Sequence, residues 1–189
     1  MFGTIENSLF DYVTIEQSCI ILDSQRIPIA ARDRIPGPYP YCGANGVQDY
    51  VANYLFDDDL ILLAEDGGHF DEIGHVAYMI SGKCWVNNHA HILKPMEPYN
   101  IYFILYCLNS IKFESEVNGS TRQKLTQSAM RKIKHPCPPI ELQNQFAEFV
   151  EQVDKSRFNY TKKYEALKRL RYSLICGMLI PVSNIDECQ

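Results

Sequence analysis

Residues 139–180 read PIELQNQFAEFVEQVDKSRFNYTKKYEALKRLRYSLICGMLI. Proline occurs only at the first position of this segment and glycine only once, at Gly177 near its end, so the segment is predicted to form a single long helix. Steps of seven residues give an apolar seam of Phe146, Val153, Tyr160, Leu167 and Leu174. Such a repeat is typical of a helix that pairs with another helix in a coiled coil.

The row of residues beside this seam is less regular. It contains Phe149 and Leu170 but is interrupted at Ser156, Lys163 and Gly177, where the next residue, such as Tyr164, often supplies the bulk. The apolar stripe therefore drifts between periods of 3.5 and 3.6 residues. A helix of this kind would be about 55–60 Å long at about 1.5 Å per residue. A domain of this size cannot cover such a length. Part of the seam is therefore expected to pack on another chain, and a second copy is the simplest candidate.

The composition is that of a folded protein. A chain of 189 residues fits one domain with a helical appendage, and 46% hydrophobic residues are enough for a core. The first residues contain no basic and apolar leader, and the apolar runs are too short to span a membrane. The seven cysteines are scattered without a Cys-x-x-Cys pair. We therefore expect a cytoplasmic protein with reduced thiols and no membrane contact.

Charge is divided unevenly along the chain. The formal net charge is −5, but residues 1–72 contain thirteen acidic and three basic residues, whereas residues 112–171 contain thirteen basic and seven acidic residues. A basic region can attract a polyanion even when the whole protein is acidic, because the local field governs the interaction. The same basic residues could instead form the solvated face of a helix.

The part of the chain before the long helix is predicted to be rich in short strands. Strand patterns occupy four segments, residues 9–29, 60–64, 75–81 and 83–93. The last two are predicted to form a hairpin through the Ser81-Gly82 turn. Residues 99–108 are predicted to form a short buried helix, Thr126 is predicted to cap another, and residues 133–139 are predicted to be extended.

Residues 35–46 are too rich in proline and glycine for a regular element, so they are predicted to form a shaped loop. Proline fixes φ and glycine allows positive φ, so such a loop can hold Tyr39, Tyr41 and Asn45 in set positions at low entropic cost. These side chains would then be placed to contact a ligand. The alternative is a rigid connection with the tyrosines packed beneath it.

The strand predicted at residues 83–93 has an unusual polar face. Alternation places the following side chains on that face: Trp85, Asn87, His89 and His91. His89 and His91 could bind a metal with His69 or His75 as a third ligand, but no carboxylate or thiol stands at a matching spacing. We favour a hydrogen-bonded polar network that braces a recognition loop, and we expect no metal site.

Residues 118–124 combine small residues with Thr121, Arg122, Gln123 and Lys124. Small residues let a ligand approach the backbone closely, and the polar side chains are of the kinds that bind phosphate oxygens and base edges. This loop is therefore predicted to contact nucleic acid.

Enzyme motifs are not recognisable in the sequence. It lacks a phosphate-binding loop, a dinucleotide fingerprint, a nucleophile elbow and a zinc-protease motif. Residues 137–140 read CPPI and lack both the amide and the aromatic side chain of the tetrad found in amino-methyltransferases. A metal-dependent nuclease built on Asp57, Asp59, Glu65 and Asp66 is an alternative, although clustered acids in loops are usually solvated. We expect no catalytic residues.

Five segments in order resemble successive motifs of one family. They are residues 34–46 (RIPGPYPYCGANG), 62–67 (LLAEDG), 85–91 (WVNNHAH), 118–126 (NGSTRQKLT) and 138–145 (PPIELQNQ). Together they resemble the target-recognition domain and the following helix of the DNA specificity subunit of type I restriction-modification systems. The resemblance runs over nearly the whole chain. Such subunits usually contain two of these domains and two long helices, whereas this chain has one of each.

The resemblance implies an α+β fold, with a mixed, strongly twisted, β-rich target-recognition domain at residues 1–138, a long coiled-coil-type helix at 139–181 and a tail at 182–189. It implies a non-catalytic subunit that reads a half-site in double-stranded DNA and directs adenine methylation and restriction by partner subunits. Those partners are a modification subunit, which would carry S-adenosylmethionine, and a restriction subunit. This chain itself is expected to need no cofactor. A homodimer through the antiparallel long helices would read a bipartite, palindromic target.

The candidate residues follow from these patterns. The candidates for DNA contact are Tyr39, Tyr41, Asn45, Gly46, Asn88, Ser120, Thr121, Arg122, Gln123 and Lys124. The candidates for the dimer or partner surface of the helix are Phe146, Phe149, Val153, Tyr160, Tyr164, Leu167, Leu170 and Leu174. The alternative function is a protein-interaction module that binds modification subunits and reads little DNA, because the acidic first 72 residues should repel a duplex.

Overall fold

The computed structural model describes residues 9–113, 115–119 and 123–179, with only the backbone for residue 154 and residues 171–179. The chain divides into two compact units, Met1–Gln145 and Phe146–Gln189. The described part of the second unit is helical and belongs to α4 (Ile140–Leu179). No helix in the described ranges is long and apolar enough to cross a membrane.

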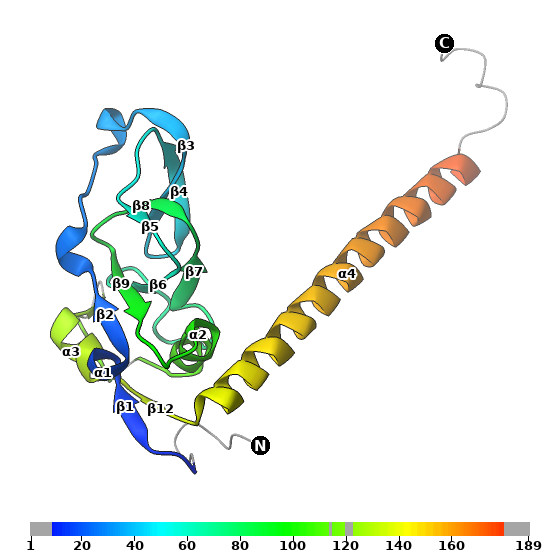
Figure 1. The fold of residues 1–189 in the computed structure, drawn as a ribbon. Helices are drawn as coiled ribbons and strands as arrows, with labels where there is room; N and C mark the ends of the chain where they lie inside the picture. Colours follow the sequence, from blue (N-terminus) through cyan, green and yellow to red (C-terminus); the bar gives the residue numbers. More distant parts are fainter. Residues whose placement is uncertain (1–8, 114, 120–122, 180–189) are drawn as a thin grey trace. The chain divides into compact units, whose positions relative to one another are not determined.

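The first unit contains two four-stranded sheets (Figure 1). In the first sheet every neighbouring pair is antiparallel, and the strand order is β2 (Cys19–Ile21), β9 (Ala90–Pro95), β6 (Leu60–Ala64) and β7 (Ala77–Ile80). The second sheet is mixed, because β3 and β8 are parallel; its order is β4 (Gly46–Val51), β3 (Pro36–Gly43), β8 (Lys83–Val86) and β5 (Phe56–Asp57). The predicted β-rich α+β architecture is confirmed.

Strand β6 is the centre of the first unit, since all five of its residues are buried. Ile61 and Leu63 face a core shared with α2 (Ile101–Asn109) and α3 (Gln127–Lys132). Leu60 and Leu62 face a second core shared with the strands of the other sheet. Burial on both faces explains why this strand reads as an unbroken apolar run.

Short elements complete the first unit. Two small sheets pair β1 (Tyr12–Thr14) with β12 (Lys134–Pro136), and β10 (Val117–Asn118) with β11 (Lys124–Leu125). The remaining elements are α1 (Ile15–Ser18) and two short 3-10 helices, η2 (Asp23–Gln25) and η3 (Ala31–Asp33). The strand pattern predicted across residues 9–29 is therefore broken by α1, because the fully buried Ile15 packs in the first core on a single helical turn.

The first turns of α4 belong to the first unit and are held by amide side chains. The buried Gln143 donates to the Pro138 carbonyl and accepts the Asn100 N–H, each at 2.9 Å. Asn100 also caps α2 and donates to Asn144. The long helix predicted at residues 139–180 is confirmed, with observed bounds of Ile140–Leu179.

The prediction of an irregular loop at residues 35–46 is wrong, because β3 and the start of β4 occupy most of it. Pairing with β4 shifts register between Pro36 and Tyr39, so a bulge accommodates prolines that cannot donate to the ladder. Gly37 lies within this shift, where an added Cβ would stand 2.3 Å from the Ala52 Cα. Strand pairing with distant residues thus overrides the local composition.

The hairpin predicted at residues 75–93 is also wrong. Strand β7 pairs with β6 in the first sheet, whereas β8 pairs with β3 and β5 in the second. Residues 87–89 form a turn between β8 and β9, so Trp85 and His91 lie on different strands and the continuous alternation does not hold. By contrast, the buried strand at 60–64, the helix near 99–108 and the Thr126 cap are confirmed.

A buried histidine joins β12 to α1. His135 Nε2 lies 2.8 Å from Ser18 Oγ, and Nδ1 lies 3.0 Å from the Pro136 oxygen. A carbonyl can only accept, so Nδ1 carries the hydrogen, while Nε2 shares the Ser18 hydroxyl with the Thr14 carbonyl oxygen, which lies 3.2 Å from that hydroxyl. Burial lowers the pKa of His135, against a smaller opposite effect of the Pro136 hydrogen bond. The neutral ring is therefore the stable form in the fold.

The folded chain should lose stability as the pH falls through the ordinary histidine value of 6.5. The unfolded chain takes up a proton at His135 before the folded chain does, so this contribution is complete above that value and is lost toward the lower folded-state pKa. Urea unfolding at about pH 8 and about pH 5 should show a smaller pH-dependent loss in His135→Gln than in the wild type. Equal losses would contradict the assignment.

Candidate nucleic-acid interface

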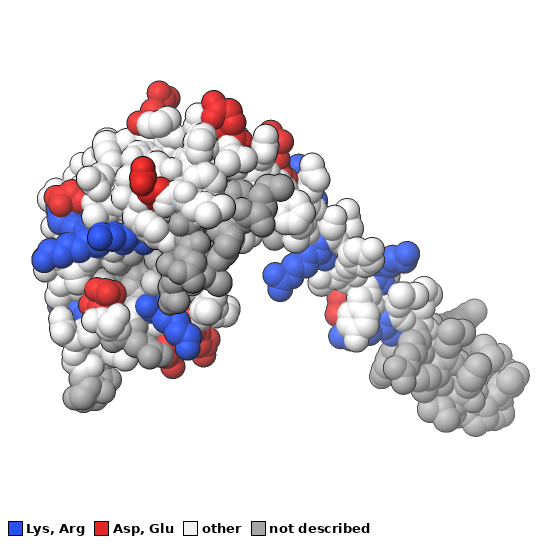
Figure 2. Space-filling view, turned by 90° about the horizontal axis from the view of Figure 1, so that it is seen from below, with Lys and Arg blue, Asp and Glu red and all other residues white. Residues whose placement is uncertain are grey.

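The described surface of the first unit carries both signs of charge (Figure 2). Most of its basic side chains lie beside carboxylates: Arg131 contacts Glu16 at 2.8 Å, and Lys94 contacts Asp58 at 2.7 Å. More than half of the described basic side chains of the first unit are therefore paired within the chain. Shaped polar groups are the other means of contact with nucleic acid that this surface offers.

Four segments meet at one end of the two sheets, and we call them the loop cluster: residues 44–46, 65–67, 87–89 and 123–124. Asn45 Nδ2 donates to the Gly67 oxygen at 2.9 Å. His89 Nδ1 lies 2.8 Å from Asp66 Oδ1, and Asp66 forms an isolated bridge with Lys124. The cluster therefore unites segments that are far apart in the sequence.

The topology explains this meeting. Strands β3 and β8 are parallel, so their carboxyl ends, which lead into residues 44–46 and 87–89, lie at the same edge. In the other sheet Ala64 pairs with Ala90, so the residues that follow β6 lie beside the turn that precedes β9. Gly46 has a φ of +112°, which allows the β3–β4 connection to turn tightly.

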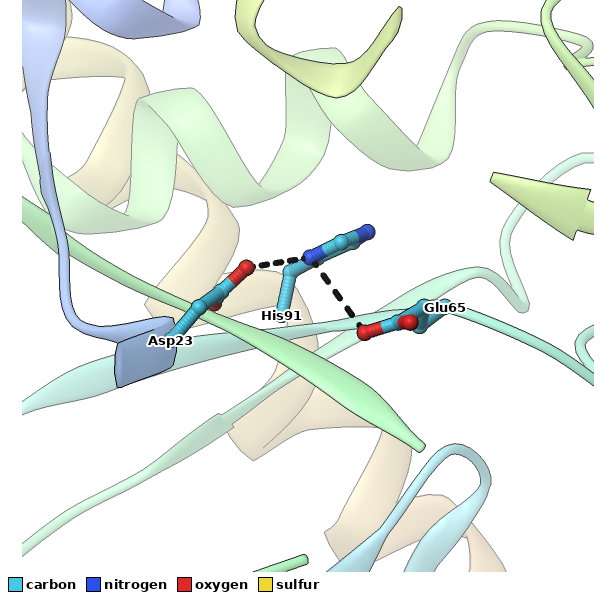
Figure 3. A group of neighbouring side chains, drawn as sticks. All are labelled: Asp23, Glu65 and His91. Carbon is cyan, nitrogen blue, oxygen red and sulfur yellow. Dashed lines mark hydrogen bonds and ion pairs between the residues drawn. The ribbon is translucent and has the colours of Figure 1, made fainter. Parts of the chain in front are cut away.

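An ionic network joins the loop cluster to η2 and β9, and Figure 3 shows three of its members, Asp23, Glu65 and His91. His91 Nδ1 lies 2.6 Å from Asp23 Oδ2 and 3.8 Å from Glu65 Oε2. Arg26 contacts the same Glu65 oxygen at 2.6 Å, and Lys124 contacts the other at 2.9 Å. The network thus ties η2, the end of β6, β9 and β11 together. It fits the predicted polar network that braces a recognition loop.

Each polar atom in this network has a defined role. His91 Nε2 lies 2.9 Å from the Leu125 carbonyl, and Nδ1 lies 2.6 Å from Asp23 Oδ2, so both ring nitrogens have a polar partner. Burial by itself would raise the pKa of the Asp23 carboxyl, but hydrogen bonding and charge from His91, then hydrogen bonds from Gln127 and the Ile92 N–H, lower it. The carboxylate is therefore held ionised.

The pKa of Glu65 is lowered in the same way. Burial opposes ionisation, but hydrogen bonds from Arg26 and Lys124 and the charge of His91 outweigh it. Asp23, Glu65 and His91 could offer a metal three atoms within 4.8 Å of one another. Arg26 and Lys124 already balance the two carboxylates, so the cluster has the chemistry of an internal ion network.

The histidines proposed as alternative metal ligands are separated. His89 pairs with Asp66 and His91 with Asp23. His69 and His75 form an edge-to-face pair, with ring centroids 6.3 Å apart, and line a different cleft of about 520 Å³. These groups do not converge on one point.

A cleft of about 630 Å³ opens beside the loop cluster. Its polar lining includes Arg34, Asn45, Gln48, Asn87, Asn88 and His89. The buried Asn87 accepts from the His89 N–H at 2.8 Å and donates to Gln48 Oε1 at 3.1 Å, so it supports the cleft wall. Asn88 is exposed on the same turn.

The structure separates the DNA-contact candidates into groups. Asn45, Gly46, Asn88, Gln123 and Lys124 belong to the loop cluster, which brings four of the five motifs together. Sequence reasoning did not single out Gln48, and only the register of β3 with β4 reveals it. Ser120, Thr121 and Arg122 lie outside the described residues.

The two tyrosine candidates have structural surroundings. Tyr41 is only 1% exposed, its hydroxyl bonds to the backbone of Ile29, and Arg34 stacks 4.1 Å from its ring centroid. It supports the hairpin from within. Tyr39 is half-buried against Tyr54, with ring centroids 5.0 Å apart, away from the loop cluster. The tyrosines are therefore packed beneath or beside β3, as in the alternative reading of this segment.

The acidic residues considered for a nuclease do not meet. Asp59 precedes β6 and Glu65 follows it, so the five-residue strand separates them by roughly 20 Å at about 3.3 Å per residue. Asp58 pairs with Lys94, and Glu65 belongs to the buried network. The described residues do not form a shared acidic centre from these two groups.

The second unit presents an apolar surface. Six of the helix candidates are exposed, namely Phe149, Val153, Tyr160, Tyr164, Leu167 and Leu170. The side chain of Leu174 lies outside the described part. Exposed apolar residues at this spacing are typical of a surface that another helix covers.

Comparison with known proteins gives one consistent answer. A sequence family described as the type I restriction modification DNA specificity domain matches residues 7–169. A Haemophilus influenzae protein named as a type I restriction enzyme specificity subunit is 31% identical over 147 residues, which cover 78% of this chain and 38% of that protein. The specificity subunit of the type I restriction enzyme EcoprrI of Escherichia coli is 25% identical over 116 residues, which cover 61% of this chain and 28% of that protein. This chain spans well under half the length of both relatives.

Solved structures share the fold. The S subunit of a type I restriction-modification system from M. genitalium matches with a TM-score of 0.60 and 18% identity, over 87% of this chain and 44% of that chain. A chain from a structure titled for complex assembly and conformational transition of the type I system matches with a TM-score of 0.58 and 15% identity, over 89% of this chain and 42% of that chain. The HsdS subunit of Thermoanaerobacter tengcongensis matches with a TM-score of 0.52 and 14% identity, over 78% of this chain and 38% of that chain.

Removal of one partner from the buried network should destabilise the fold. Asp23→Asn removes the charge opposite His91 and Arg26, so unfolding in urea should become easier by about 3–5 kcal/mol, as when one member of a buried ion pair is lost. Asp33→Asn is a matched control, because the Asp33 side chain is 62% exposed and its ion-pair partner among the described residues is the exposed Arg32; it should change stability by less than about 0.5 kcal/mol. Similar small changes in both variants would show that the network does not brace the fold.

Proposed function

This chain belongs to the type I restriction-modification DNA specificity domain family, and from that premise we propose that it reads one half-site of a duplex for partner subunits. Specificity subunits of these systems are non-catalytic. The observation that carries the proposal is the loop cluster, in which separate motifs converge on an open polar cleft above a rigid ionic network. Preorganised polar groups of this kind favour recognition of base edges.

The proposal assigns chemistry to the partners. A modification subunit would bind S-adenosylmethionine and methylate adenine, and a restriction subunit would cleave unmodified DNA, in the cytoplasm. This chain would then supply only the sequence preference. The resemblance to specificity subunits supports this division of work, and the structural relative described in terms of complex assembly is consistent with it.

The second part of the proposal is a homodimer through α4. Six exposed apolar residues lie along one stripe of α4, and the relatives named above are more than twice as long as the segment that they share with this chain. A second copy would supply the second recognition domain and the second helix. The target would then be bipartite and palindromic, with a spacer that the helices set.

The charge distribution of α4 favours an antiparallel pair. Residues 140–154 contain four acidic residues and no basic ones, whereas residues 155–171 contain seven basic residues and one acidic residue. In an antiparallel pair the acidic segment of each helix lies beside the basic segment of the other. A parallel pair would place like charges side by side, which is unfavourable at short range.

The recognition proposal is tested in a bacterial host that expresses this chain with a cognate modification subunit. Long-read sequencing of methylated DNA should show a new adenine-methylated motif that is bipartite and palindromic. The same host with the modification subunit alone is the control and should lack this motif. No new motif would contradict the reading function, and a continuous, asymmetric motif would contradict the dimer.

The dimer proposal is tested by sedimentation at micromolar concentration. The wild type should show a monomer–dimer equilibrium that tightens with the modification subunit and weakens as salt is added. Leu167→Asp places a charge in the apolar stripe and should weaken association by at least about tenfold. Phe158→Asp, on an exposed aromatic residue about 180° around the helix from Leu167, is the matched control and should resemble the wild type. A strict monomer, even with the modification subunit, would overturn the dimer.

A further inference from the structure

We propose that the cleft beside the loop cluster reads an adenine in the major groove through the side-chain amide of Asn88, by neutral hydrogen bonds and not by charge. This inference rests on the proposed function and names the base and the residue. It starts from the hydrogen bonds that the cleft has already used and those that it leaves open.

Asn88 is the open amide of the cleft. Its side chain is exposed and makes no hydrogen bond to any described residue, so both its donor and its acceptor are available. The neighbouring Asn87 differs, because both ends of its amide are engaged, with the His89 N–H and with Gln48. Asn87 thus supports the wall of the cleft, whereas Asn88 is placed to contact a ligand.

The turn that carries Asn88 is fixed on both sides. The Asn87 N–H donates to the Cys42 oxygen at 3.0 Å, and the Glu65 N–H donates to the His89 oxygen at 2.9 Å. On the other side Arg26 donates to the Ala90 oxygen at 2.8 Å. A turn held at both ends loses little conformational entropy when it binds, so it can present an amide with defined geometry.

The described cations around the cleft are already neutralised. Arg26 contacts Glu65 at 2.6 Å, Lys124 contacts the same carboxylate at 2.9 Å, and Arg34 contacts Asp49 at 3.2 Å. A bidentate contact to guanine from Arg26 or Arg34 would have to break one of these pairs. Recognition through amides avoids that cost.

The donor and acceptor pattern selects adenine. Adenine presents its N7 acceptor next to its N6 amino donor in the major groove, and an asparagine amide can satisfy both at once. Guanine presents two acceptors there, so the amide could satisfy only one of them. Two neighbours could extend the contact, because the Asn45 amide oxygen and the Gln48 amide nitrogen make no hydrogen bond to any described residue.

The test is selection of bound sequences from a random duplex library by the full chain, with and without the modification subunit. The wild type should select a motif with adenine at one position by roughly 5- to 150-fold over other bases. Asn88→Ala should bind the same motif with that position relaxed. Asn88→Asp replaces the donor by an acceptor and should shift preference toward cytosine, whose N4 amino group donates.

Asn53→Ala is the matched control. Asn53 is an exposed asparagine just beyond the end of β4 that lies away from the β3–β4 turn. Its removal should leave the selected motif unchanged. Circular dichroism of all variants establishes that each is folded.

A modified base gives a second readout. Replacement of the selected adenine by 7-deazaadenine removes the N7 acceptor, so wild-type binding should weaken, whereas Asn88→Ala should be insensitive. The dependence of affinity on salt should be the same for the wild type and Asn88→Ala, because a neutral contact releases no counterion.

The outcomes separate the two proposals. If neither sample selects a motif, the proposed function fails and this inference fails with it. If a motif is selected but Asn88→Ala retains full preference at every position, the function stands and the role of Asn88 is overturned. A preference lost at a position other than adenine, or a reduced salt slope, would also overturn the inference.

Discussion

Strand β6 is buried on both faces, and the arrangement of the first unit depends on this constraint. Leu60 and Leu62 need one core, and Ile61 and Leu63 need another. Full burial of an aliphatic side chain contributes about 1.5–3 kcal/mol, so the four residues supply a large share of a typical net stability. Each face of β6 must therefore be covered by a separate layer of secondary structure. The helices supply one layer and the second sheet supplies the other.

The end of β6 places a carboxylate in a largely buried position, where it needs ionic partners from other segments. The chain passes from the buried Ala64 directly to Glu65, a carboxylate that is largely removed from water. Such a charge is costly unless it is paired and hydrogen-bonded. Arg26 and Lys124 form ion pairs with Glu65, and His91 links Glu65 to Asp23. Ionic contacts of this type add little net stability, but they define which segments lie together.

The two units use charge differently. In the first unit the described cations near the cleft face carboxylates of the same chain, so the cleft is polar but nearly neutral. In α4 the charges are segregated along the helix, and ion pairs such as Lys155–Glu151 are exposed and weak. A nearly neutral cleft can distinguish bases by the pattern of their hydrogen-bond donors and acceptors. Segregated charge along α4 favours an antiparallel over a parallel helix pair. The proposed division between a reader and a spacer follows from this contrast.

The sequence by itself determined the elements whose signal is local. The 40-residue helix, the buried strand β6 and the Thr126 cap follow from periodicity, a continuous apolar run and a side-chain oxygen before a helix. The order of five motifs was sufficient for the family. The tertiary structure alone decided the pairing of β3, which overrides a proline-rich composition, and the separation of β7 and β8 into different sheets. It also decided that Tyr41 is buried while Asn88 is open, because burial depends on distant partners such as Ile29 and Arg34 that no local spacing encodes.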